Sequence, residues 1–325
     1  MYGGAKGKAG AGASLHDGNP VWSHANRHVD LWVELLHGWE LEPIAALPFT
    51  VAQDFEGDQF TLSSFPASDL ERLYGITMHE LSVYGDLESH VVAQTCRGNV
   101  VLLEVDSYHL PQPGAYRRQH GLSSIAVDVL VPEAAAVGYY HADGYHTASG
   151  PDYANIFRRR GGLRDPDATA QPHAEVVRRR FAPQDGAAIL RVSLDLLRQH
   201  LAHRPQQNPI ATFRRAFPAH LEQLMAHGEP NFQSYAASVL RQLGANFELL
   251  GCYLRWLAGQ GQPLPAGLAE ACYTVASEAM VMQFRLMRAV ISHKPDPCHD
   301  CLEQLELSYQ ASVPALAAHF GVGAG

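Results

Sequence analysis

Apolar residues early in the chain recur at the spacing of an amphipathic helix. The stretch that begins near His28 repeats them every three or four positions, and charged residues fall on the opposite side. Asn26 lies just before this stretch and has the short polar side chain that favours a helix N-cap. The sequence therefore predicts a helix from about residue 28, with a buried face formed by Leu31, Trp32, Leu35, Leu36 and Trp39.

The next part of the chain combines short strands and short helices. Residues 47–51 and 59–62 are short segments of apolar or alternating character, which predict two strands. Helices are predicted at 68–74 and at 86–97, and Gly98 ends the second of them. The first half of the chain therefore mixes α and β elements.

Three nearly continuous apolar runs follow. They cover residues 99–105, 124–130 and 137–141, and such runs are typical of strands that are covered on both faces. Pro132 and the D-G pair at 143–144 mark turns. Because the runs follow one another closely, we expect an antiparallel sheet that packs on the first helix.

The second half of the chain is helical. Residues 158–185 are predicted to be a polar, arginine-rich connection, and apolar residues then follow a helical period to the end. Clusters of Gly, Pro and Asn separate the helices. The predicted helices cover 186–203, 209–227, 231–260, 266–294 and 299–319.

These elements predict an α+β protein in three parts. Residues 1–20 are rich in Gly and Ala and are expected to be disordered. Residues 21–165 are predicted to form an α/β domain built on the antiparallel sheet, and residues 166–325 an all-α helical domain. A chain of 325 residues is long enough for more than one hydrophobic core.

Composition and charge exclude several function classes. No uncharged stretch of about 18 apolar residues exists, so we expect no membrane partner. The net charge of −9 argues against general binding of nucleic acid. The start lacks the apolar middle of a signal peptide, and the five cysteines do not form the even set of a secreted disulfide framework. We therefore predict a cytoplasmic protein.

Polar residues with catalytic potential gather around the first apolar run. Side chains alternate along a strand, so Glu104, Asp106 and Tyr108 fall on one side of the segment E-V-D-S-Y-H-L-P. His109 and His120 bracket the loop that follows. This density of titratable groups predicts a site for acid–base chemistry.

Several of these groups also have a structural interpretation. Glu104 inside an apolar strand needs a partner, and an ion pair with Arg117 or Arg27 would supply one. His120 would then cap its loop, and the acidic loop at residues 54–58 would be a solvated turn.

Two spacings are compatible with metal ligands, but neither completes a site. His24 and His28 lie four apart, as two ligands on a helix would, yet no third ligand is identifiable and Asn26 interrupts that helix. Cys298 and Cys301 have C-x-x-C spacing, whereas a zinc site usually needs a second pair. We therefore predict no metal site and no bound cofactor.

Six segments, taken together, resemble a known family. They are HVDLWVELLHGWELEPIAAL, DFEGDQFTLSSFP, LYGI, VVLLEVDSYHLP, YRRQHGLSSIAV and LGANFELLGCYLRWLA, in this order. Over roughly residues 20–320 the chain is similar to a bacterial family of unknown function, number 1839 among the domains of unknown function. That family looks distantly similar to the papain-like N-terminal domain of the butirosin acyl-transferring enzyme. The resemblance therefore implies a papain-like first domain and chemistry on a carrier-bound acyl or aminoacyl thioester.

The resemblance assigns three catalytic positions, and this chain departs from the pattern at two of them. Papain-like acyl transfer needs a thiolate at a helix N-terminus, a histidine base, and an Asp or Asn that orients the base. The nucleophile position falls on Arg27, and no cysteine precedes Cys96. The base position falls near Ser123 or Ser124, whereas Asp143 occupies the orienting position.

The same resemblance implies a partner. Members of the family are often encoded near amino acid:carrier-protein ligases and small carrier proteins, which are acidic and carry a phosphopantetheine phosphate. Arginine binds such a phosphate through paired hydrogen bonds, and the candidates here are Arg158, Arg159 and Arg160. The remaining contacts to substrate or partner are expected from Asn26, Arg27, Tyr108 and His109.

We expect an acyltransferase-like protein that acts on a carrier-tethered acyl or aminoacyl thioester without a cysteine nucleophile. His120 is then the general base, and Asp143 or Glu104 orients it in a cleft that Asp106 also borders. One alternative is a non-catalytic partner of the carrier or its ligase, with Arg27 filling that cleft. Another is a metal-dependent hydrolase with three ligands among His24, His28, Asp54 and His120.

Overall fold

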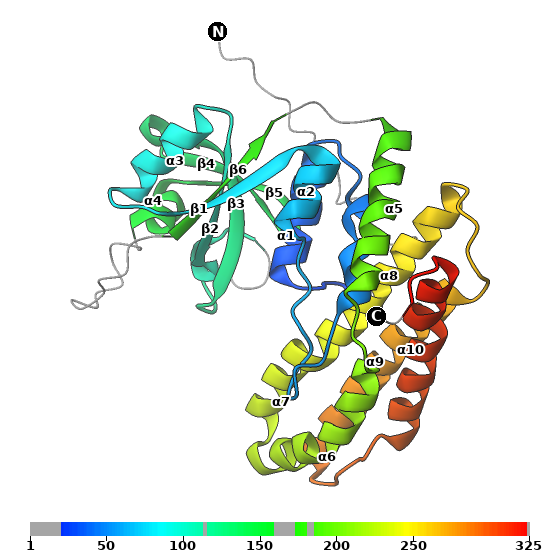
Figure 1. Ribbon diagram of the computed structural model, residues 1–325. Helices are drawn as coiled ribbons and strands as arrows, with labels where there is room; N and C mark the ends of the chain where they lie inside the picture. The colour runs from blue at the N-terminus through cyan, green and yellow to red at the C-terminus, as the bar shows by residue number, and fades with distance from the viewer. Residues whose placement is uncertain (1–20, 113–115, 159–172, 181–184, 324–325) are drawn as a thin grey trace. The chain divides into compact units, whose positions relative to one another are not determined.

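A computed structural model describes residues 21–112, 116–158, 173–180 and 185–323 of the chain. The chain divides into two compact units (Figure 1). The first unit contains the described residues of 27–43 and 66–184, and the second those of 14–26, 44–65 and 185–325. The segment 1–20, for which the sequence predicts disorder, lies outside the described residues.

The first unit is built on an antiparallel sheet whose strand order differs from the chain order, so the predicted α+β class and antiparallel sheet are confirmed. Its six strands lie in the order β1-β6-β2-β3-β4-β5. The strands predicted at 99–105, 124–130 and 137–141 are β2, β3 and β4. The strand bounds are Ile76–Ser82 for β1, Val100–Asp106 for β2, Leu122–Val131 for β3, Ala136–His141 for β4, Gly144–Ser149 for β5 and His173–Arg179 for β6.

Helices cover both faces of this sheet because its strands are apolar on both sides. On one face, Val127 and Tyr139 belong to a buried cluster with residues of α3 (Leu87–Thr95) and α4 (Gly150–Arg158). On the other face, α1 (Arg27–Gly38) packs against β3, β4 and β5, and a methyl group at Gly38 would collide with Tyr140. The predicted packing of the first helix on the sheet is therefore confirmed.

One prediction for the first unit is wrong. Part of the segment predicted to be an arginine-rich connection is the strand β6, which pairs with both β1 and β2. Its sequence H-A-E-V-V-R-R buries Ala174, Val176 and Val177, so three apolar residues suffice for an inner strand. The first unit includes β6, which follows the predicted boundary at 165/166.

The short strands predicted before the sheet also differ from the structure. Residues 47–51 lie mostly in a 3-10 helix, Pro48–Ala52, where Pro48 at the first position has the backbone angle that a helix start requires. Residues 59–62 contribute one isolated bridge, between Phe55 and Phe60. Residues 44–65 belong to the second unit. The other short elements are the helix α2 (Ala67–Tyr74) and the 3-10 helices Pro43–Ala46, Ser107–His109 and Pro132–Ala134.

The second unit confirms the predicted helices closely. They are α5 (Gly186–Ala202), α6 (Pro209–His227), α7 (Glu229–Tyr235), α8 (Arg241–Gly259), α9 (Leu268–Ser292) and α10 (His299–His319). A π-helical segment, Ala236–Leu240, joins α7 to α8, so the predicted helix 231–260 is one run with a local widening. Among the described residues, no helix is both long enough and apolar enough to cross a membrane.

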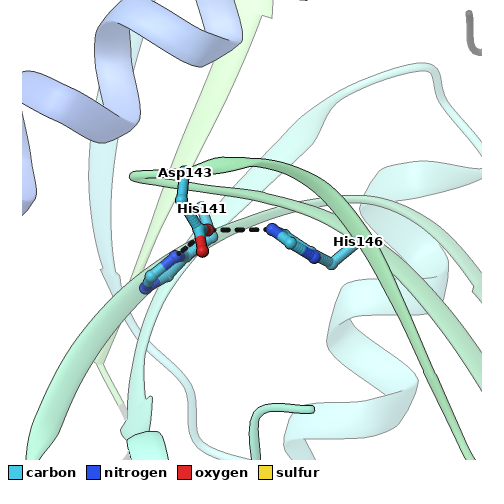
Figure 2. A group of neighbouring side chains, drawn as sticks. All are labelled: His141, Asp143 and His146. Carbon is cyan, nitrogen blue, oxygen red and sulfur yellow. Dashed lines mark hydrogen bonds and ion pairs between the residues drawn. The ribbon is translucent and has the colours of Figure 1, made fainter. Parts of the chain in front are cut away.

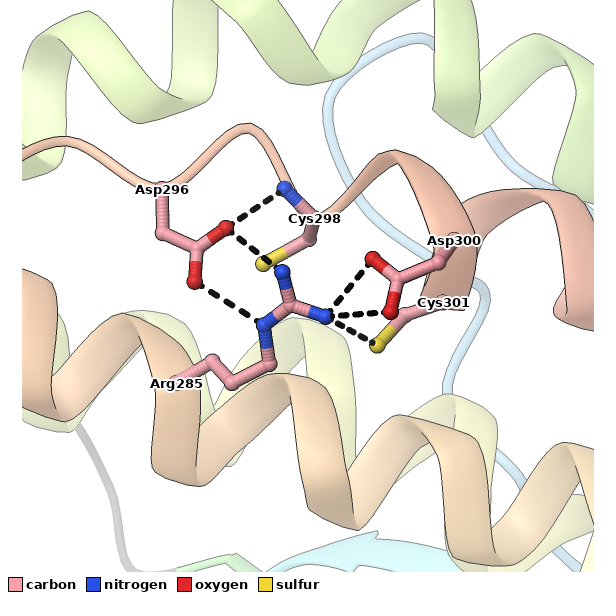
Figure 3. A network of polar contacts seen from close by, with 5 residues as sticks. All are labelled: Arg285, Asp296, Cys298, Asp300 and Cys301. Carbon is pink, nitrogen blue, oxygen red and sulfur yellow. Dashed lines mark hydrogen bonds and ion pairs between the residues drawn. The ribbon is translucent and has the colours of Figure 1, made fainter.

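An arginine holds the connection between α9 and α10. Arg285 on α9 donates to both carboxylate oxygens of Asp296, at 2.8 and 2.9 Å, and to both of Asp300, at 2.7 and 2.8 Å (Figure 3). The same guanidinium lies 3.3 Å from the sulfur of Cys301, and Asp296 also accepts from the backbone of Cys298 at 3.0 Å. The C-x-x-C pair is thus part of a hydrogen-bonded helix junction, and both cysteines are buried and free.

Gly244 of α8 is required by a buried tryptophan, and its replacement by alanine is expected to cost about 2 kcal/mol of unfolding free energy. The new methyl group would collide with the indole of Trp22, which donates to the Ala276 carbonyl at 3.0 Å. Urea unfolding measures the loss. Gly259, at the end of the same helix, has open space around its Cα, so Gly259→Ala should stay within about 1 kcal/mol of wild type. Equal effects of the two changes would contradict this packing.

Candidate functional site

The β4–β5 hairpin carries a tight group of polar side chains. His141 ends β4, Asp143 lies in the turn, and His146 lies in β5. The turn predicted at the D-G pair is present, and Gly144 adopts a φ of 129°, which a residue with a side chain rarely does. His141 Nδ1 lies 2.6 Å and His146 Nε2 2.8 Å from the same oxygen, Oδ1 of Asp143 (Figure 2).

Strand register explains why these rings share a face with a serine of the neighbouring strand. His146 pairs with Tyr139, and Tyr139 pairs in turn with Val127 of β3. Side chains alternate along a strand, so His141 lies on the face of Tyr139, and Ser123 lies on the face of Val127. Three adjacent strands therefore present Ser123, His141 and His146 on the same side of the sheet.

Ser123, His141 and Asp143 form a continuous hydrogen-bonded series. The hydroxyl of Ser123 lies 2.9 Å from Nε2 of His141, and the other ring nitrogen lies on Asp143. In the tautomer with a proton on Nδ1, the imidazole donates to the carboxylate and accepts from the hydroxyl. This is the arrangement in which a histidine can take the proton of a serine nucleophile. Ser123 is buried, whereas Asp143 is 37% exposed.

Asp143 is held as a carboxylate. The hydrogen bond from His141 lowers the pKa of Asp143 to about 2, although burial opposes this, and His146 adds to the lowering. Asp143 therefore stays negative at neutral pH, as a group that orients a histidine must. Burial raises the pKa of the nearby Glu34 on α1, and the charges of Asp143 and Asp30 raise it further.

The structure pairs His120 with a different carboxylate from the one expected. Nδ1 of His120 lies 2.7 Å from Asp106, and the ring of Tyr108 stacks on the His120 ring with centroids 4.3 Å apart. Asp106 also accepts from the backbone of Tyr108 and of Gly121, and these bonds together with His120 lower its pKa although burial opposes it. Asp143 binds His141 and His146 instead, and neither histidine is among the predicted site residues.

Glu104 has the structural partner that the sequence offered as an alternative. Arg27 Nη2 lies 3.0 Å from Glu104, and Nη1 donates to the Leu122 carbonyl at 3.2 Å. Arg117, the other candidate, lies 3.6 Å from Asp152. Arg27 thus stands at the N-terminus of α1, at the position that the resemblance gives to the thiolate, and its charge is paired. Glu104 lies opposite Ser124 in the β2–β3 register, on the face that Ser123 does not share.

The remaining predicted residues fall outside the hydrogen-bonded series. Asn26 donates to the Ser63 carbonyl at 2.9 Å and to Gln242 at 3.4 Å, both in the second unit. His109 is buried in the first unit beside Tyr108, with ring centroids 5.1 Å apart. Arg158 is the last residue of α4, and Arg159 and Arg160 lie outside the described residues.

Sequence reasoning missed three residues of the site as functional groups. Ser123 falls near the expected base position but cannot act as a base, and His141 and His146 are outside the predicted set of site residues. A signal was present: H-A-D-G-Y-H places two imidazoles on either side of an acidic turn that was itself predicted. Because a hairpin brings the residues before and after its turn together, this pattern predicts a His-Asp-His cluster.

The fold and the site together define a class: an α+β unit with a hydrogen-bonded Ser-His-Asp group, joined to an all-helical unit. Residues 11–179 match the DUF1839 N-terminal domain and residues 186–318 match the DUF1839 C-terminal domain. The chain therefore belongs to the DUF1839 family, and the predicted resemblance to that family is confirmed. The boundary between the two matches lies after β6 and before α5. No curated protein matches the chain.

Proposed function

We propose that this protein is an acyl-transfer enzyme in which Ser123 attacks the carbonyl carbon of a thioester. The observation that carries the proposal is the series of short contacts from Ser123 through His141 to Asp143, at 2.9 and 2.6 Å. In this proposal Ser123 takes the role of the missing cysteine, and His141 rather than His120 is the general base. Strand pairing brings Ser123 and His141 together, although they lie 18 residues apart in the sequence.

Each group in the series has one task. His141 takes the proton of Ser123 as the Oγ–C bond forms, and the imidazolium returns it to the sulfur as the C–S bond breaks. The acyl group then sits on Ser123 as an ester. His141 next takes a proton from an acceptor amine or water as it attacks the ester carbonyl, and the imidazolium returns that proton to Ser123 Oγ as the Oγ–C bond breaks. Asp143 remains a carboxylate throughout and stabilises the imidazolium.

A carrier-tethered acyl or aminoacyl thioester is the substrate class we propose. The support is the family resemblance, together with a sulfur leaving group that is easily expelled. The carrier protein, and a ligase that loads it, remain predicted partners, with Arg158, Arg159 and Arg160 as candidates for the phosphopantetheine phosphate. The papain-like fold and the cytoplasmic location stay predictions too, and the position of Arg27 at the N-terminus of α1 supports the former.

A second candidate function is a non-catalytic partner of the carrier. One observation favours it: Arg27 occupies the expected thiolate position and is bound to Glu104 and to the Leu122 carbonyl. In this case the Ser-His-Asp series would be structural, and the protein would recognise the loaded carrier without changing it.

Mass spectrometry of the intact protein tests the proposal. The protein is incubated without acceptor amine, first with acyl-pantetheine thioesters and then with carriers loaded with different aminoacyl groups. We expect the mass of the protein to rise by one acyl group, and peptide mapping to place the group on Ser123. Binding of the loaded carrier with no covalent adduct and no release of its acyl group would favour the second candidate instead.

A further inference from the structure

The His-Asp-His cluster on the β4–β5 hairpin holds more ligand atoms than acyl transfer uses. His146 has no task in the proposed reaction, yet its Nε2 lies 2.8 Å from Asp143. Within the described part of the chain, His141, Asp143 and His146 are the one group of three such residues whose ligand atoms lie within 4.8 Å of one another. All three come from six consecutive residues, so the hairpin alone fixes their spacing.

We propose that His141, Asp143 and His146 bind a divalent transition-metal ion of the Zn²⁺ class. Two imidazole nitrogens and one carboxylate oxygen form a donor set that suits Zn²⁺, Co²⁺ and Fe²⁺, whereas Mg²⁺ and Ca²⁺ favour oxygen alone. Three protein ligands leave a coordination position for water or another small ligand. These residues differ from His24 and His28, which the sequence offers as possible metal ligands because they lie four residues apart.

The cluster is built so that little movement is needed. The side chains of His141 and His146 are 19% and 25% exposed, so they are sheltered but an ion can reach them. The second nitrogen of His141 lies on Ser123, and such an outer hydrogen bond fixes the orientation of a metal-binding imidazole. The three ligand atoms lie within 4.8 Å of one another, so after small side-chain rotations one ion placed among them can lie roughly 2.0–2.2 Å from each, as zinc does from nitrogen and oxygen ligands.

A buried tyrosine beside the cluster supports a bound ion. Tyr139 is fully buried, and its ring centroid lies 6.0 Å from that of His146. Its hydroxyl has no hydrogen-bond partner among the residues that the structure describes, and buried hydroxyls rarely lack one. Asp143 also acts electrostatically on Tyr139 and on Glu34 of α1. A cation with a bound water would offset this negative charge and could satisfy the tyrosine.

Metal binding has one consequence that rests on the proposed function. Nδ1 of His141 and the carboxylate of Asp143 would hold the ion, and the acyl-transfer mechanism needs the same atoms. A bound ion and proton transfer from Ser123 therefore exclude each other, so Zn²⁺ would inhibit acyl transfer reversibly. The binding itself does not depend on any activity of the protein.

Cobalt absorption spectroscopy on the full chain, freed of metal with EDTA, tests the binding. Adding Co²⁺ should produce visible absorption bands that saturate at one ion per chain and disappear when Zn²⁺ is added. His146→Ala should weaken Co²⁺ binding by more than about 100-fold, because even the loss of an outer-shell partner costs 10- to 100-fold. His146→Gln provides a second variant, and circular dichroism checks that both fold.

Two further variants keep the failures apart. His120→Ala removes an exposed imidazole of the same unit that is bound to Asp106, and it should bind Co²⁺ like wild type. Ser123→Ala removes the outer hydrogen bond to His141 but no ligand, so it should bind Co²⁺ roughly 10- to 100-fold more weakly than wild type and still more tightly than His146→Ala. The proposal is overturned if wild type binds Co²⁺ no better than folded His146→Ala or His146→Gln protein, or if His120→Ala loses as much affinity as they do.

Discussion

Replacing Ser123 by alanine is expected to lower kcat/KM for an acyl thioester by at least about 1,000-fold, or roughly 4 kcal/mol of transition-state stabilisation. The change removes the atom that would attack the carbonyl and leaves His141 without the hydroxyl at 2.9 Å. Folding should persist, since alanine fits the same buried place and a lost hydrogen bond costs only about 1 kcal/mol. Release of free pantetheine thiol measures the rate, and circular dichroism checks the fold.

Ser124→Ala is the matched control for this experiment. Ser124 is the neighbouring serine of the same strand and is also buried, but it faces the opposite side of the sheet, across from Glu104. It should retain near-wild-type activity. If both variants lose activity equally, the loss reflects disturbance of β3 and not removal of the Ser123 hydroxyl, and the serine mechanism is contradicted.

The same assay separates the two candidate bases. His141→Ala should lose activity to the same extent as Ser123→Ala, and the double variant should lose little more, because residues that act as a unit are not additive. His120→Ala should retain activity, since His120 is bound to Asp106 and is 61% exposed. The opposite outcome would return the base to His120, where the sequence alone had placed it.

The helical half could be predicted almost to the residue because its signals are local. Apolar positions repeat along each helix, and side chains such as Asp185 and Asn208 cap helix starts, at 2.7 and 2.9 Å from backbone nitrogens. The strand β6 could not be predicted in the same way. It is short and polar at both ends, and its place between β1 and β2 depends on pairing with residues about 75 to 100 positions away.

The site was only partly predictable because a β-bulge lies between Ser123 and the apolar residues at the end of β3. Pairing shifts between Val127 and Val129, so these two residues face opposite sides although they are two apart. Counting down from the apolar residues at the end of β3 therefore assigns Ser124, and not Ser123, to the face of His141. Only the register with β4 distinguishes the two serines, and the alternation of apolar and polar residues along β3 does not reveal that register.

Replacing Arg285 by alanine is expected to lower the free energy of unfolding by about 3 kcal/mol. The guanidinium is 26% exposed and binds two carboxylates, so its loss leaves Asp296, itself only 19% exposed, without its cation. Arg285→Lys should recover less than half of the loss, because an ammonium group cannot donate the paired bonds. Arg288→Ala, exposed on the same helix about one turn later, should stay within about 0.5 kcal/mol of wild type in urea unfolding.

The effect of Arg285 should also depend on pH in a defined direction. Hydrogen bonds from Arg285 lower the pKa of Asp296 to about 2, although burial opposes this, whereas an unfolded aspartate has a pKa of about 3.9. Between these values the unfolded chain binds more protons than the folded one, so this stabilisation is fully present above about pH 4 and is lost as pH falls toward 2. Solvent screening leaves it at about 1–2 kcal/mol. The difference in stability between wild type and Arg285→Ala should therefore narrow by that amount between pH 5 and pH 2. A difference that stays constant with pH would show that Arg285 stabilises the α9–α10 junction by packing and not by its bond to Asp296.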